Sequence, residues 1–229
     1  MAPATVARPH PAQPTVWPMR SHARVAFFPG EEQAARRIAR RLFGRCLEAW
    51  QYAGLAGAPD GARVEVGGSG DALLLELDDP VAAVYRAVFY VRPAASGVVL
   101  WNEGLRIHCR AMRRRGLGTR IFHRQVVNAA ALRVTRIALT AGRSHDENGY
   151  YTWPRFGFDG PLPASIRKAL PAELHAARSV LDLFESEQGR RWWRDRGVAL
   201  PLAFDLSPGS RSRRVFDRYL RGRFRFTAK

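Results

Sequence analysis

The residues best suited to bind a ligand form a short glycine-containing turn that leads into a predicted helix. Arg113, Gly116 and Gly118 occupy this turn in the order Arg-x-x-Gly-x-Gly. Backbone N–H groups in such a turn and at a helix N-terminus are unsatisfied donors at the positive end of the helix dipole, so they bind an anion without needing a side chain. The turn therefore predicts a bound phosphorylated cofactor. Because so short a pattern also arises by chance in a chain rich in arginine and glycine, the prediction depends on the elements around it.

The elements around the turn are a strand, a helix and a second strand. The sequence predicts a strand at 105–109 before the turn, a helix over 117–132 after it, and a buried strand at 134–141. A crossover helix between two strands of one sheet makes those strands parallel. The turn is therefore expected at the end of a strand that has a parallel neighbour.

Strand-like runs separated by turn residues precede these elements and predict a meandering antiparallel sheet. The runs are 63–66, 73–77, 83–92 and 98–101, the third of which also fits a helical turn, and a separate first strand is expected at 22–28. Apolar residues at helical spacing predict a helix over 31–53 with an arginine-rich, solvated outer face. The predicted fold class is α/β (α+β), with a mixed, mostly antiparallel twisted sheet flanked by helices.

The two ends of the chain differ in composition from its centre. Residues 1–21 contain five prolines and no acidic residue, which predicts a flexible tail. Residues 22–163 form the predicted sheet-containing domain, and 164–229 form a predicted basic, helical C-terminal extension. Within that extension, helices are expected at 171–187, at 189–196 and from Ser210 onward, with an irregular link at 204–209.

The charge of the chain favours acidic partners, such as nucleic acid, an anionic membrane surface or a polyanionic substrate. Its 229 residues carry a net charge of +17, and 35 of the 37 basic residues are arginine. Because alanine, glycine and proline are also abundant, a coding bias toward guanine and cytosine explains the arginines equally well. The charge alone therefore does not identify a partner.

The last predicted helix concentrates arginine on one face. Nucleic acid or an acidic protein is the partner that such a basic stripe would contact, although a solvated or internally paired face fits the spacing as well. The Trp192–Trp193 pair, which lies between arginines, is expected to fix a helix onto the body of the protein. The arginines of the stripe are Arg211, Arg214, Arg218, Arg221 and Arg225.

The sequence does not predict a metal site, a disulfide framework or a membrane-spanning segment. Cys46 and Cys109 are too few for a disulfide framework, which favours a reducing, cytoplasmic setting. The loop His145–Glu147 has one histidine beside two acids, too weak a pattern to predict a metal site. Because no apolar run is long enough to cross a bilayer, no membrane partner is predicted.

Residues 63–159 resemble the GNAT (N-acetyltransferase) superfamily. The turn with its flanking strands and helix corresponds to the superfamily's signature, and Asn148 with the aromatic run to Gly157-Phe158 corresponds to the end of that signature. The run from Gly149 to Phe158 also resembles an uncharacterised group of bacterial and phage-associated GNAT-like proteins. The resemblance implies a GNAT-like acyltransferase domain at 22–163 that uses acetyl-CoA, or another coenzyme A thioester.

The resemblance also implies where the cofactor would bind. The pyrophosphate would lie at the turn and the start of the helix, and the pantetheine arm would pair with the backbone of the preceding strand where that strand splays from its parallel neighbour. The implied cofactor-binding residues are Ile107, Cys109, Arg113, Arg114, Arg115, Gly116, Leu117, Gly118, Thr119 and Asn148.

For catalysis, the resemblance implies direct attack of an amine on the thioester. Glu103 or His108 would take the proton of the amine, although a turn residue and a half-exposed strand residue are the simpler interpretations. Trp153 stands where the family often has the tyrosine that protonates the thiolate, and an indole cannot act as that acid. Tyr150 or Tyr151 would have to replace it.

Two hypotheses about function remain open at this point. The first is an N-acyltransferase that passes an acyl group from coenzyme A to an amine. The second is a catalytically inactive GNAT-like protein that binds nucleic acid or a protein partner through its arginine-rich surfaces. The complete glycine turn favours the first hypothesis, and Trp153 favours the second.

Overall fold

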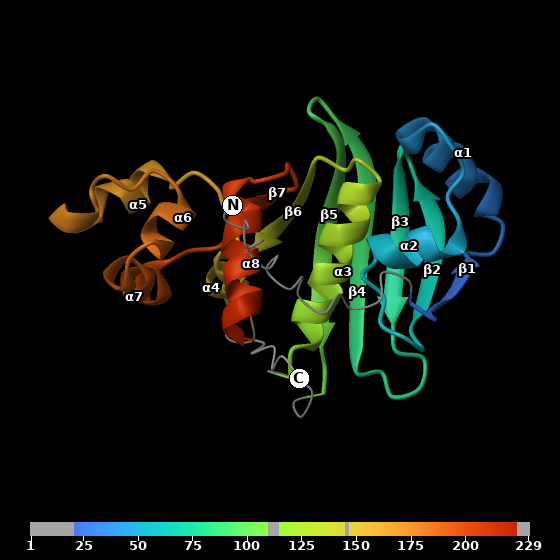
Figure 1. Ribbon diagram of the computed structural model, residues 1–229, viewed down its shortest axis with the longest axis horizontal. Helices are drawn as coiled ribbons and strands as arrows, with labels where there is room; N and C mark the ends of the chain where they lie inside the picture. Colours follow the sequence, from blue (N-terminus) through green and yellow to red (C-terminus); the bar gives the residue numbers. More distant parts are fainter. Residues whose placement is uncertain (1–20, 110–114, 145–146, 224–229) are drawn as a thin grey trace, which may run out of the picture.

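A seven-stranded mixed sheet runs through the computed structural model, which describes residues 21–109, 115–144 and 147–223 (Figure 1). The strands lie side by side in the order of the sequence, from β1 to β7. They are β1 (Arg24–Phe27), β2 (Arg63–Ser69), β3 (Ala72–Asp78), β4 (Tyr85–Ala94), β5 (Gly97–Ile107), β6 (Arg136–Ala141) and β7 (Leu200–Asp205).

The pairing of these strands confirms the predicted mixed, mostly antiparallel sheet. The β1–β2 and β5–β6 pairs are parallel, and the other neighbouring pairs are antiparallel. Both parallel pairs follow from helical crossovers, because a chain that returns through a helix enters the sheet in its original direction. The predicted tail at 1–21 lies, except for Ser21, outside the described residues.

Helices cover one face of the sheet and extend beyond its β7 edge. The helical segments are α1 (Glu32–Phe43), α2 (Ala49–Leu55), α3 (Leu117–Ala131), α4 (Gly149–Arg155), α5 (Ala164–Lys168), the short 3-10 helix η2 (Ala172–Leu174), α6 (Val180–Phe184), α7 (Glu187–Arg196) and α8 (Arg211–Arg223). In Figure 1, α1, α2 and α3 lie over one face of the sheet, and α8 lies beside α3. Helices α5, α6 and α7 project past β7.

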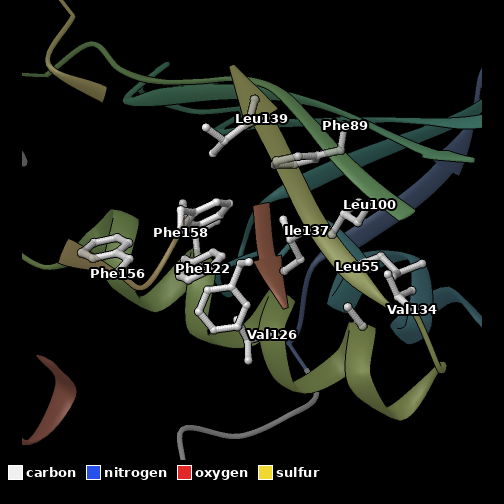
Figure 2. Close-up of a cluster of buried hydrophobic side chains, with 14 of the residues drawn as sticks. Leu55, Phe89, Leu100, Phe122, Val126, Val134, Ile137, Leu139, Phe156 and Phe158 are labelled. Atoms are coloured by element: carbon white, nitrogen blue, oxygen red, sulfur yellow. The ribbon is translucent and has the colours of Figure 1, made fainter. Parts of the chain in front are cut away.

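The hydrophobic core lies between the sheet and α1, α2 and α3. Alternate residues of the central strands, such as Leu75, Phe89 and Leu100, are fully buried there against Leu55 and Phe122 (Figure 2). Residues of the opposite alternation form ion pairs across β2, β3 and β4, such as Arg86 with Glu76. This alternation is typical of antiparallel strands that have one buried face.

Four predicted elements differ from the structure. The helix expected over 31–53 is two helices, because Gly44 adopts a left-handed φ of 71° that ends α1. The separate strands expected at 98–101 and 105–109 are one strand, because β5 continues through 102–104. The helix expected over 171–187 is replaced by η2 and α6, each only one turn long.

The fourth difference is β7, which no predicted element covered except the expected irregular link at its last two residues. Pro201 is compatible with this strand because β7 is the last strand of the sheet, where a missing N–H donor is tolerated. Since β7 pairs with β6 along its whole length, residues 164–229 contribute a strand to the same sheet as residues 22–163.

An aromatic cluster joins this C-terminal part to the sheet. Phe122 of α3 lies at its centre, with ring centroids 4.9–6.0 Å from five other aromatic rings. Those rings come from α4, the segment after it, β7 and α8, so one side chain ties four segments to α3. They belong to Trp153, Phe156, Phe158, Phe204 and Phe216.

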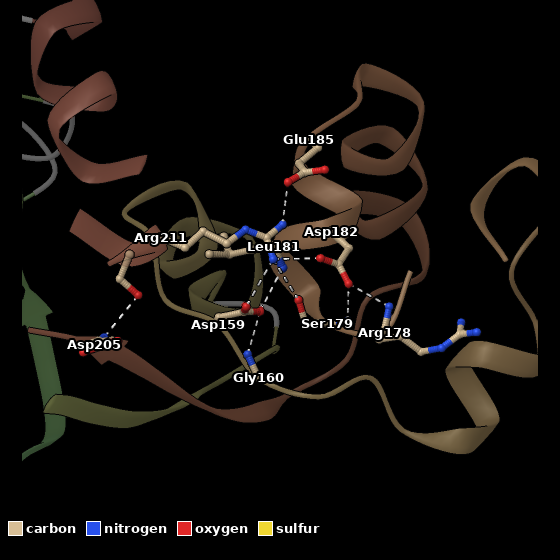
Figure 3. Close-up of polar contacts among 10 residues, drawn as sticks. Asp159, Gly160, Arg178, Ser179, Leu181, Asp182, Glu185, Asp205 and Arg211 are labelled. Atoms are coloured by element: carbon tan, nitrogen blue, oxygen red, sulfur yellow. Dashed lines mark hydrogen bonds and ion pairs between the residues drawn. The ribbon is translucent and has the colours of Figure 1, made fainter. Parts of the chain in front are cut away.

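Arg211, the first residue of α8, ties the helices beyond β7 to one another (Figure 3). Its guanidinium nitrogens lie 2.7 Å from Asp182 Oδ1, 2.8 Å from Glu185 Oε1 and 3.7 Å from Asp159 Oδ2. Asp159 also accepts a hydrogen bond of 2.9 Å from the backbone N–H of Leu181. The contacts fix α8, α6 and the segment after α4 at one point.

We expect Arg211→Met to lower the free energy of unfolding by about 1–3 kcal/mol, because it leaves three carboxylates without their shared cation. The matched control is Arg191→Met, which removes an exposed pair with Glu187 on α7 and should cost less than about 0.5 kcal/mol. Chemical denaturation measures both values. Equal losses in the two variants would contradict a special role for Arg211.

The Asp182 carboxyl gives this contact a pH dependence. Burial alone would raise its pKa, but hydrogen bonds from the Arg178 backbone, the Arg211 guanidinium and the Ser179 backbone outweigh burial and hold the pKa below its usual value. A depressed folded-state pKa stabilises the protein above the unfolded pKa of about 3.9, and this stability is lost as the pH falls through the folded value.

We therefore expect Asp182→Asn to be less stable than the wild type at pH 7, and the difference to shrink as the pH falls below about 4. Denaturation of both proteins over a pH series measures this. Asp195→Asn, which alters an exposed pair with Arg194, is the control and should change little at any pH. A difference for Asp182→Asn that is constant with pH would show that its charge does not matter.

Candidate functional site

The N-terminus of α3 presents backbone donors where the sequence predicts them. Gly116 is the N-cap with a left-handed φ of 80°, and the helical hydrogen bonds begin with the N–H of Arg120, which donates to Gly116 O at 3.0 Å. Within the described part of the chain, the N–H groups of Leu117, Gly118 and Thr119 have no acceptor. Three donors at the positive end of a helix form an arrangement that attracts an anion.

Of the arginines in the predicted turn, only Arg115 falls within the described residues, and it is exposed. Arg113 and Arg114 lie outside them. Gly118 faces β5, where an added Cβ would lie 3.9 Å from Ile107 Cδ1 and 4.0 Å from Leu105 Cδ2. The start of α3 therefore lies close to the end of β5.

Beside the start of α3, β5 and β6 separate. Their pairing covers only Val99–Asn102 on β5 and Arg136–Leu139 on β6, although β5 continues to Ile107 and β6 to Ala141. The last residues of β5 therefore keep β4 on one side and have no β6 partner on the other. This separation matches the splayed pair of strands that the sequence analysis expected.

A β-bulge marks the point of separation. Val88 of β4 pairs with Gly104, and Phe89 pairs with Asn102, so Glu103 is an extra residue on β5. The buried side chain of Asn102 exchanges hydrogen bonds of 3.3 and 3.5 Å with Gln125 of α3, and Gln125 also donates to Leu55 O at 3.2 Å. Asn102 and Gln125 thus hold β5, α3 and α2 together where the strands part, which the sequence analysis missed.

The backbone of β5 alternates between its two edges beyond the bulge. The N–H groups of His108 and Cys109 donate to Val84 O at 2.7 and 3.4 Å, so they face β4. Because hydrogen-bonded and non-hydrogen-bonded pairs alternate in an antiparallel ladder, the peptide groups of Leu105 face the edge that β6 has left. Leu105, which was not among the predicted binding residues, is thus better placed than Cys109 to pair with an extended ligand.

The two predicted proton acceptors lie at this end of β5, and both are exposed. Glu103 Oε2 accepts a hydrogen bond of 2.8 Å from Trp101 Nε1, and His108 is the first residue after β5. A further carboxylate lies across the separation, since Arg106 of β5 approaches Glu147 in the loop after β6 at 3.5 Å. The arginine–glutamate pair bridges the two diverging chains, and no sequence motif predicted it.

The predicted acids Tyr150 and Tyr151 belong to α4 and turn toward the C-terminal helices. The Tyr150 hydroxyl donates to Arg194 O of α7 at 2.7 Å, and the Tyr151 ring lies 5.7 Å from the ring of Phe184 in α6. Asn148, the N-cap residue of α4, is exposed, and its side chain accepts a hydrogen bond from Thr152 Oγ1 at 3.0 Å. Both tyrosines therefore contact structural neighbours, while the predicted bases lie on β5.

The aromatic run forms core as well as surface. Trp153 packs edge-on against Phe122 and Phe158, with centroid distances of 6.0 and 5.1 Å, so the indole contributes to the core. The expected packing role of the two tryptophans of α7 is confirmed for Trp193, which is fully buried and donates to Tyr150 O at 2.9 Å.

The basic stripe of α8 is divided between internal pairing and the surface. Arg211 is held by carboxylates, whereas Arg214, Arg218 and Arg221 are exposed. Arg225 lies outside the described residues.

The residues that the structure describes contain no candidate metal site and no candidate membrane-spanning helix. No group of three or more histidine, cysteine, aspartate or glutamate side chains there is arranged to hold a metal ion, and His145 and Asp146 are outside that part. Among the same residues, no helix is both long and apolar enough to span a bilayer. Compared with models of protein families and with curated proteins, the chain matches none of them.

The two glycines of the turn should respond differently to alanine. Gly116→Ala places a Cβ in the left-handed region and should cost about 1–2 kcal/mol of stability. Gly118→Ala meets only ordinary contacts inside a helix and should be neutral or stabilising by up to about 1 kcal/mol. Thermal denaturation measures both. The same sign of change in the two variants would contradict this account of the turn.

Proposed function

We propose that the chain is an acyl-CoA-dependent N-acyltransferase, in which the start of α3 binds the phosphates of the cofactor and the open edge of β5 binds its pantetheine arm. The observation that carries the proposal is the coincidence of three features: the amides of Leu117, Gly118 and Thr119, the separation of β5 from β6, and the outward-facing peptide of Leu105. The resemblance of residues 63–159 to the GNAT superfamily agrees with this arrangement.

The residues present fit such a cofactor in charge and shape. Amides at a helix N-terminus suit a diphosphate, because they donate hydrogen bonds where the helix dipole is positive. The peptide of Leu105 offers a donor and an acceptor to an extended amide chain, as an added strand would use them. When bound, acetyl-CoA would supply an acyl group activated as a thioester.

The chain would contribute mainly orientation and hydrogen-bond donors. An amine bound at the separation of the strands would attack the thioester carbonyl carbon, and the exposed β5 backbone would donate to the carbonyl oxygen. Glu103 or His108 would accept the proton of the amine, and Glu147 adds a third group within this region. Proton transfer to the departing sulfur has no evident protein donor on β5.

The position of the tyrosines favours a second candidate function. With the Tyr150 hydroxyl engaged by Arg194 O and Tyr151 against Phe184, the chain would lack the acid that members of the superfamily often use. A protein that keeps the fold without acyl transfer, and binds a partner through its arginines, accounts for this arrangement. Coenzyme A binding without measurable acetyl transfer to any amine would support that alternative.

The experiment is a melting curve with and without millimolar coenzyme A. A ligand that binds only the folded state stabilises it by RT ln(1 + [L]/Kd), so a ligand at one hundred times its Kd should add about 2.7 kcal/mol and raise Tm by several degrees. We expect Gly118→Asp to abolish this shift, because a carboxylate would lie where the phosphates bind. The variant itself should melt normally, since an acid in the first turn suits the helix dipole.

Gly118→Asn is the matched control, because it has nearly the same shape without the charge. It should retain more of the coenzyme A shift than Gly118→Asp. An equal shift in the wild type and in Gly118→Asp would show that the start of α3 is not the phosphate site.

A further inference from the structure

A second anion site is built into the C-terminal helices. A cavity of about 470 Å³ lies between α4, α6, α7 and α8. Apolar groups such as Pro154, Leu181 and Val215 form part of its wall, and five of its lining residues are arginines. These are Arg155, Arg190, Arg211, Arg214 and Arg218.

Among the residues that the structure describes, four of the five guanidinium groups have no carboxylate within ion-pair distance. Glu185 is the only acid among the described lining residues, and it lies 2.8 Å from Arg211. Asp182 and Asp159, from outside the cavity, lie 2.7 and 3.7 Å from the same arginine. Within the described ranges, no ion pair reaches the other lining arginines. The acids of this region therefore converge on one arginine (Figure 3), and the cavity keeps a large positive charge.

Three of these guanidinium groups are held by uncharged partners, which are backbone carbonyl groups or aromatic rings. Arg190 donates to Phe184 O at 2.8 Å, and Arg214 donates to Gly209 O. Arg155 lies over the rings of Tyr151 and Tyr219, each at 5.9 Å. Since a guanidinium has five N–H donors, each group still has donors for a ligand while its position is restrained.

The unpaired charge is unfavourable without a ligand. Arg214 and Arg218 are four residues apart on α8, where like charges destabilise a helix by a few tenths of a kcal/mol. A compact anion with several charges would remove this repulsion. Phosphate groups fit best, because two linked phosphates bring their charges within a few atoms and match the forked guanidinium geometry. Carboxylates of an acidic peptide are spread over separate residues.

We propose that this cavity binds a compact ligand with two or more directly linked phosphate groups, such as the phosphate chain of a free nucleotide. The site is distinct from the proposed coenzyme A site. Phe216 faces Phe122 of α3 at 4.9 Å, whereas Arg214, Val215 and Arg218 of the same helix line the cavity. The body of α8 thus lies between the two sites.

The test measures binding of inorganic tripolyphosphate, ATP, a short single-stranded oligonucleotide and a glutamate-rich peptide to the full chain. The test variant is Arg214→Gln/Arg218→Gln. The control is Arg37→Gln/Arg45→Gln, which removes the same charge from exposed residues on and just after α1, at the opposite end of the sheet (Figure 1). We expect tripolyphosphate affinity to fall roughly tenfold for each pocket arginine removed, and less than about twofold in the control.

Each outcome decides the proposal. Tighter binding of ATP than of the oligonucleotide supports the proposal, and the reverse order would overturn it in favour of a nucleic-acid strand. The proposal is overturned if the wild type binds none of the phosphate probes, if both double variants lose affinity equally, or if the peptide binds as tightly as tripolyphosphate. If Gly118→Asp still binds tripolyphosphate, the cavity is a site separate from the proposed coenzyme A site. If Gly118→Asp loses tripolyphosphate binding, the anion binds at the start of α3, and the proposal of a second site is overturned.

If the double variant unfolds, Arg218→Glu provides the same test, because Arg218 is exposed and forms no hydrogen bond or ion pair with the described residues. This single charge reversal should leave Tm within a few degrees of the wild type and reduce tripolyphosphate affinity by at least about tenfold. Unchanged affinity would overturn the proposal.

Discussion

The position of α3 depends on the packing of Phe122, and much of the structure depends on α3. Five aromatic rings from α4, β7, α8 and the segment after α4 surround this side chain. Gln125, one turn further along the same face of α3, is hydrogen-bonded to Asn102 and to Leu55 O. The helix is therefore fixed both by apolar packing and by a buried polar contact. Because that helix also carries the donors at Leu117–Thr119, the same contacts set where those donors point relative to the open edge of β5.

The distribution of charge follows from a shortage of acids. With 20 acidic residues for 37 basic ones, at least 17 basic residues cannot have a carboxylate of their own. Some, such as Arg63 and Arg86, pair across exposed strands, where each pair contributes little to stability. Near α8 three carboxylates instead converge on Arg211, which fixes α6 and α8 but leaves the neighbouring guanidinium groups unneutralised. A strong contact at one arginine thus creates the positive cavity beside it.

Local pattern allowed the central sheet and the turn before α3 to be predicted, and long-range contacts explain what was missed. Turn residues between β2, β3 and β4 marked these strands as neighbouring antiparallel elements. β7 had only a weak local signal, the alternation of Leu200, Leu202 and Phe204, which Pro201 interrupts. The role of Asn102 had no local signal, since its partner lies 23 residues away. The bulge at Glu103, which joins the strands expected at 98–101 and 105–109 into one, likewise depends on a long-range contact, the pairing of β5 with β4.

The arrangement of the arginines answers a question that composition leaves open. A coding bias toward arginine would scatter guanidinium groups over the surface, and the exposed arginines of α1 are consistent with such scatter. It would not by itself anchor Arg190 and Arg214 to backbone carbonyls, or place Arg155 over two tyrosine rings, around one cavity. Restraining several like charges in one place raises the free energy of the ligand-free protein, so solvation alone does not favour it. Binding of a phosphate-rich anion provides the compensating interaction, which is why the cavity, and not the net charge, is the stronger argument for an anionic ligand.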